Sequence, residues 1–194
     1  MTRRVLGLLC VHLLLAGCAQ LGLRVETEPV AAVMISESRA GGQSAAAYQE
    51  TAGTWLDSTG KSTAEGCSLE IGSRFVDIAS GPSGARAQWT LVPGESGSHD
   101  VQVTWPRSGN ANNVTYTVTS GDETSRQTQS HVLTQNGWGG GEAGNANEWI
   151  TLATVEAQAG EPIVIEISDE AVSGGPDTIN AARMYADAAR LVKR

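Results

Sequence analysis

Hydrophobic and polar residues alternate in several short runs of this chain, and this alternation constrains the fold more than any other feature. The clearest runs cover residues 87–91, 101–105 and 114–118. Successive side chains of a β-strand point to opposite faces of a sheet, so a period of two predicts strands with one buried face. Weaker runs at residues 149–155 and 162–168 extend the pattern. The sequence therefore predicts an all-β fold of many short strands.

Turn-forming residues separate these strands. Glycine occurs 23 times in the 194 residues, and segments such as Pro93–Gly97 and Ser120–Glu123 lie between alternating runs. Glycine, proline and small polar residues interrupt strands and favour tight turns. A polar strand is expected from about residue 124 to residue 135.

The C-terminal segment has two interpretations. Residues 180–192 are rich in alanine, which favours a helix, and Asn180 is a suitable N-cap. Residues 184–189 also alternate with a period of two, which favours a strand. Local propensity alone predicts the helix.

The N-terminus has the features of an export signal. Arg3 and Arg4 precede a short apolar stretch that ends in the sequence Leu-Ala-Gly-Cys at residues 15–18. A charged start followed by such a stretch is typical of a signal peptide, and the stretch is too short for a permanent membrane span. The ending resembles the lipobox of bacterial lipoproteins, which implies cleavage before Cys18 and a lipid on Cys18. The alternative is an ordinary signal peptide with a chance cysteine.

These features predict an organisation in three parts: a signal peptide at residues 1–17, a lipidated Cys18 with a short flexible tether at residues 18–44, and a domain at residues 45–194. Within the tether, residues 30–35 are either an edge strand or linker. The protein is expected outside the cytoplasm, attached to membrane lipid through Cys18. Ala19 differs from the aspartate that resembles an inner-membrane retention signal, so the outer membrane is favoured in a Gram-negative cell.

Charge and motifs limit the possible functions. The formal net charge of −8 disfavours nucleic acid as a partner. No H-E-x-x-H, G-x-S-x-G or Cys–His signature indicates catalysis, so we expect no enzyme and no cofactor. Asp169, Glu170 and Asp177 match no known calcium loop, so we expect solvated turn carboxylates and no metal. Cys67 is expected to be a small, half-buried residue.

Several segments in order resemble the domain shared by golvesin C-termini and xanthan lyases, which is described as carbohydrate-binding-like. The resemblance covers about residues 48–194 and rests on residues 48–55, 85–90, 97–106, 112–118, 133–135, 148–152 and 186–192. It implies a jelly-roll-like β-sandwich, with the C-terminal segment as a strand. The chain departs from the family at His99 and Asp100, where a tyrosine is common, and in an inserted loop at residues 136–147.

The inserted loop is the candidate glycan site. It brings together an aromatic ring and amide side chains, which bind sugars by stacking and hydrogen bonding; these residues are Trp138, Asn136, Asn145 and Asn147. The alternative is that Trp138 folds back onto the sandwich as a plug.

Other residues are predicted to be structural. Trp89, Trp105 and Trp149 lie in strand patterns or at strand starts and are expected to lie mostly in the core. Asp187 is expected to bond to the backbone or to Arg86 and Arg183. The expected function is a membrane-anchored, non-catalytic module for extracellular polysaccharide or cell-wall glycan; the alternative is a structural module that contacts another envelope protein.

Overall fold

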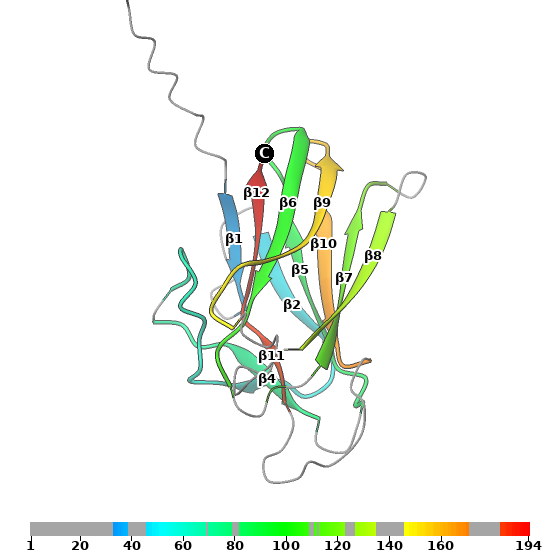
Figure 1. Cartoon of the computed structure of the whole chain (residues 1–194). Coiled ribbons are helices and arrows are strands. Elements are labelled where there is room, and N and C mark those ends of the chain that lie inside the picture. The colour runs from blue at the N-terminus through cyan, green and yellow to red at the C-terminus, as the bar shows by residue number, and fades with distance from the viewer. Residues whose placement is uncertain are drawn as a thin grey trace, which may run out of the picture. The chain divides into compact units, whose positions relative to one another are not determined.

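The structure is a computed structural model, and it describes residues 33–38, 46–68, 70–78, 82–108, 111, 113–122, 127–134, 146–170 and 183–194. The predicted signal peptide, Cys18 and Ala19 lie outside these residues. Within the described segments the regular structure is β-strand (Figure 1). No helix long and apolar enough to cross a membrane occurs in that part of the chain.

Two antiparallel sheets form the body of the domain. The first contains, in spatial order, β1 (Val33–Glu37), β12 (Ala188–Lys193), β6 (Gly97–Thr104) and β9 (Ile150–Ala157). The second contains β2 (Ala46–Ala52), β5 (Arg86–Leu91), β10 (Ile163–Ser168), β7 (Asn113–Ser120) and β8 (Gln127–Thr134). Figure 1 shows the first sheet in front of the second as a separate layer.

A third, smaller sheet lies at one end of the two layers (Figure 1). It consists of β11 (Arg183–Ala186), β4 (Arg74–Asp77) and β3 (Leu56–Asp57). Along the chain, β5, β6 and β7 alternate between the two large sheets, as do β9 and β10. This crossing between layers is typical of a jelly roll, and the predicted all-β sandwich is confirmed.

The core lies between the two large sheets. Alternate residues of β5 and β7 are buried, as the period of two predicts. The largest fully buried side chains come from both layers and include Trp89, Trp105, Tyr116, Ile165 and Leu191. Trp105 and Tyr116 stack with ring centroids 6.4 Å apart. Burial of an aliphatic side chain such as Ile165 or Leu191 stabilises the fold by about 1.5–3 kcal/mol.

The C-terminal segment is a strand where the structure describes it. β12 lies between β1 and β6, so its backbone bonds on both sides. Ala188 and Ala189 are completely buried there. Pairing on both sides of the strand overrides the local helix propensity, as tertiary context commonly does.

β1 changes the predicted organisation of the chain. Its residues pair in register with β12, from Val33 opposite Val192 to Glu37 opposite Ala188. Of the two interpretations of residues 30–35, the edge strand is the one found, over Val33–Glu37. Residues 33–37 therefore belong to the sandwich and not to the tether predicted for residues 18–44.

Candidate functional site

The inserted loop is described only at its C-terminal end. Asn136, Trp138 and Asn145 lie outside the described residues. Asn147 adopts a left-handed backbone conformation with φ of 67°, which asparagine tolerates better than most residues. Its amide N–H donates to the Trp105 carbonyl at 3.0 Å, and its side-chain Oδ1 accepts from the Thr63 amide at 3.2 Å. Asn147 thus holds neighbouring segments together within the protein.

The three tryptophans expected in the core differ in how deeply they are buried. Trp89 and Trp105 are fully buried, whereas Trp149 is half-buried and lies outside the core cluster. The Trp149 indole N–H donates to the Glu65 carbonyl at 2.8 Å. The Arg190 guanidinium lies 4.2 Å from its ring centroid, a cation–π geometry. The core position expected for Trp149 is therefore wrong: the residue precedes β9 and fastens the segment that contains Glu65.

Asp187 lies at the break between β11 and β12, and it fastens the same segment. We call residues 58–68 the strap. The buried Asp187 carboxylate accepts a hydrogen bond from the Ser62 amide at 2.5 Å. The Ser62 hydroxyl lies 2.7 Å from the hydroxyl of Thr104 on β6. Of the partners expected for Asp187, the backbone is the one found.

The two arginines expected beside Asp187 have other carboxylate partners. Arg86 pairs with Glu166 and Glu170, and Arg183 pairs with Asp77. The arginine alternative for Asp187 is therefore wrong.

Burial sets the protonation of two groups around the strap. Burial raises the pKa of Asp187 from 3.8 to about 7, although the Ser62 amide opposes the shift. Burial, together with the nearby Asp187, raises the pKa of Cys67 to about 12. The Cys67 thiol therefore stays protonated near neutral pH and is a poor nucleophile.

Asp169 differs from the solvated turn carboxylate that was expected. It is fully buried, and its Oδ2 accepts hydrogen bonds from the Ser83 amide at 2.5 Å and the Ser83 hydroxyl at 2.7 Å. Within the described segments, no group of three or more His, Cys, Asp or Glu side chains is arranged to hold a metal ion. Asp177 lies outside those segments.

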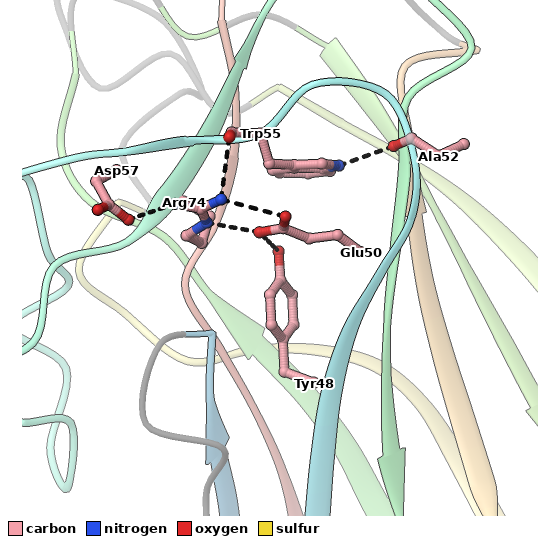
Figure 2. Close-up of polar contacts among 6 residues, drawn as sticks. All are labelled: Tyr48, Glu50, Ala52, Trp55, Asp57 and Arg74. Atoms are coloured by element: carbon pink, nitrogen blue, oxygen red, sulfur yellow. Dashed lines mark hydrogen bonds and ion pairs between the residues drawn. The ribbon is translucent and has the colours of Figure 1, made fainter.

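An open cavity of about 540 Å³ is the candidate binding site, and we call it the polar hollow. Its lining comes from the turn after β1 and from strands β2, β3 and β4, and consists of Ser38, Tyr48, Gln49, Glu50, Asp57 and Arg74. Figure 2 shows four of these side chains converging, with Trp55 beside them. A volume of this size falls in the range of about 300–1,000 Å³ that is usual for ligand sites.

Arg74 is the centre of the polar hollow (Figure 2). Its Nε donates to Glu50 Oε1 at 2.5 Å, and its Nη2 donates to Glu50 Oε2 at 3.2 Å. Nη1 donates to Asp57 Oδ1, and Nη2 also reaches the Trp55 carbonyl at 3.0 Å. Hydrogen bonding to Glu50 is the main reason that the pKa of Arg74 is raised. The guanidinium therefore binds two carboxylates and one carbonyl.

The turn between β2 and β3 brings these groups together. Gly53 has φ of +87°, and a Cβ at this position would lie 2.6 Å from the Ala85 Cβ, so glycine is required. After the turn, the Trp55 indole N–H donates to the Ala52 carbonyl at 2.9 Å. The chain then pairs with β4, which sets Asp57 directly opposite Arg74. Oppositely charged cross-strand neighbours stabilise such a pair.

Tyr48 and Ser38 complete the lining. The Tyr48 ring packs against Trp89 with centroids 5.4 Å apart, and its hydroxyl points to Glu50 Oε1 at 3.5 Å (Figure 2). Burial raises the pKa of Tyr48 well above its usual value, so the phenol stays neutral. Ser38 is 7% exposed, and its hydroxyl has no hydrogen-bond partner within the described residues.

Sequence reasoning did not find the polar hollow. Its residues come from four separate segments, and no spacing in the sequence links Ser38, Glu50 and Arg74. One signal was available: Gly53 shortly before Trp55 was part of the family resemblance, and this turn presents Asp57. The pairing of the small third sheet, which has no sequence signature, brings Arg74 to the site.

Comparison with known proteins identifies the family of this chain. The Golvesin C-terminal domain family matches residues 42–193. A Paenibacillus xanthan lyase structure is similar, with a TM-score of 0.54 and 22% identity over 84% of this chain and 13% of the lyase. A family 35 carbohydrate binding module from Clostridium thermocellum gives a TM-score of 0.45 and 15% identity, covering 84% of this chain and 99% of the module. No curated protein matches. The chain belongs to the Golvesin C-terminal domain family.

Proposed function

We propose that this protein is a non-catalytic carbohydrate-binding module of the cell envelope, which binds extracellular polysaccharide or cell-wall glycan in the polar hollow. The observation that carries the proposal is the hollow itself. It is open to solvent, and its lining of hydroxyl, amide, carboxylate and guanidinium groups matches the chemistry of sugar hydroxyls. The similar lyase is named for xanthan, and this chain corresponds in extent to a small part of that enzyme.

The side chains that line the hollow have different roles in the proposed binding. Gln49 is exposed and has both an amide donor and a carbonyl acceptor, and Glu50 offers acceptors. The Tyr48 ring, fixed against Trp89, supplies an aromatic edge beside these groups. Both carboxylates of the hollow contact the same guanidinium, so the arrangement offers hydrogen bonds and not a carboxyl pair set up for proton transfer.

Membrane attachment completes the proposed function. A lipid on Cys18 would hold the sandwich at the envelope, since burial of acyl chains contributes about 0.8 kcal/mol per methylene. The prediction is tested by metabolic labelling with a fatty acid. The wild type should incorporate the label and remain with the membrane fraction, and Cys18→Ser should lose both properties. A labelled Cys18→Ser variant would contradict the lipidation.

Glycan binding is tested with the full chain in detergent by co-sedimentation with insoluble polysaccharides. We expect Gln49→Ala to weaken binding, because an exposed amide that contacts sugar is lost without disturbing the core. Gln158→Ala removes a similarly exposed glutamine beyond the hollow and should have no effect. Trp138→Ala tests the inserted loop as a second contact. Absence of binding to every polysaccharide would favour the structural module instead.

A further inference from the structure

We infer that the polar hollow selects sugars that bring hydrogen-bond donors and no acid group, that is, neutral or amino sugars, and rejects uronic acids. The inference rests on the proposed function and adds the class of sugar. Three features of the hollow support it: its net charge, the binding of its one cation by its own carboxylates, and its exposed hydrogen-bond acceptors.

The net charge of the lining is negative. Glu50 and Asp57 contribute two carboxylates, and Arg74 contributes one guanidinium. The side chains of Ser38 and Gln49 carry no charge, and the Tyr48 phenol stays neutral because burial disfavours its ionised form. An approaching sugar carboxylate therefore meets an excess of like charge, which opposes binding.

Arg74 is not available to capture an acidic sugar. Recognition of a carboxylate by arginine normally uses two parallel N–H groups of the guanidinium. In the hollow, Glu50 occupies the edge formed by Nε and Nη2, and Asp57 binds Nη1. To bind Arg74 through two parallel N–H groups, a uronic acid would have to displace one of these carboxylates, which leaves the displaced charge without its partner.

The remaining hydrogen-bonding capacity favours donors on the ligand. Each oxygen of Glu50 can accept more than one hydrogen bond. Gln49 and Glu50 are exposed in the hollow, so a sugar hydroxyl or amine can donate to their side-chain oxygens.

Binding of matched oligosaccharides to the full chain tests the inference by isothermal titration calorimetry. The ligands are oligomers of glucose, glucosamine and galacturonic acid of equal length. We expect glucose and glucosamine oligomers to bind, and galacturonic acid oligomers to bind at least about fourfold more weakly, the effect of one like charge at about 5 Å even in water.

Variants that change the net charge of the hollow test the same inference directly. Glu50→Gln combined with Asp57→Asn changes the hollow from one net negative charge to one net positive charge and releases Arg74, so the galacturonic acid oligomer should gain affinity. Glu156→Gln combined with Glu161→Gln removes the same charge from exposed positions beyond the hollow and should leave the preference unchanged. Asp57→Asn alone, at a side chain that is 61% exposed, is the milder variant if the double one folds poorly.

Equal or tighter binding of galacturonic acid oligomers by the wild type would overturn the inference and leave the proposed function standing. If none of the three oligomers binds, the inference is overturned, and absence of binding to every polysaccharide in the co-sedimentation assay would overturn the proposed function as well.

Discussion

Replacing Asp187 with asparagine should stabilise the fold at neutral and alkaline pH. Asp187 is 5% exposed, and the one donor to its carboxylate within the described residues is the Ser62 amide. An asparagine has nearly the same shape, and its carbonyl oxygen can accept the same bond. The substitution therefore removes the cost of a buried charge while the strap stays attached.

The magnitude follows from the pKa of Asp187. Folding raises this pKa from 3.8 to about 7. Because the folded pKa is the higher one, the folded state binds the proton more tightly than the unfolded state. The stability associated with the proton is fully present below about pH 4 and is lost as the pH rises through 7. At about 1.4 kcal/mol for each pKa unit, the ionised group costs on the order of 4 kcal/mol at pH 8.

Urea unfolding of the wild type and of Asp187→Asn at pH 5 and pH 8 measures this difference. We expect the variant to gain stability relative to the wild type from pH 5 to pH 8. Asp187→Ala is the control, because it leaves the Ser62 amide without an acceptor and should be destabilised at pH 5. A stability difference between wild type and Asp187→Asn that does not change with pH would refute the reasoning.

Other predictions concern the turn, the core and the thiol. Gly53→Ala should lower the free energy of unfolding by about 1–3 kcal/mol, because the left-handed backbone and the contact with Ala85 both oppose a side chain, and urea unfolding measures it. Trp89→Ala should cost about 3–5 kcal/mol in the same assay by leaving a cavity, and a smaller loss would mean that the two sheets close over it. Cys67 should react with a thiol reagent at pH 8 far more slowly in the folded than in the unfolded chain, and equal rates would contradict its raised pKa.

The fold could be predicted in outline because its main signal is local. The alternation around Val103 and Tyr116 depends on side chains of neighbouring residues, and both segments are strands with the expected buried faces. The C-terminal strand followed only from the family resemblance, since alanine favours a helix until β1 and β6 pair with it on both sides. The role of β1 was undecided for the same reason, because an edge strand is defined by its partner.

The candidate site depends on contacts between distant segments, and therefore sequence reasoning could not assemble it. Arg74 and Glu50 meet only because the Gly53 turn leads from β2 into β3 and β4 pairs with β3. The same limit applies to Asp187, whose backbone partner Ser62 lies far away in the sequence. The loop with Trp138 had a clear composition signal, and its part in binding stays a prediction.

The most direct test of glycan binding in the polar hollow is a crystal structure of the protein with a glucose oligosaccharide. We expect a sugar ring in the hollow, with hydroxyls bonded to Gln49 and Glu50. A sugar bound at the inserted loop with the hollow empty would contradict the account.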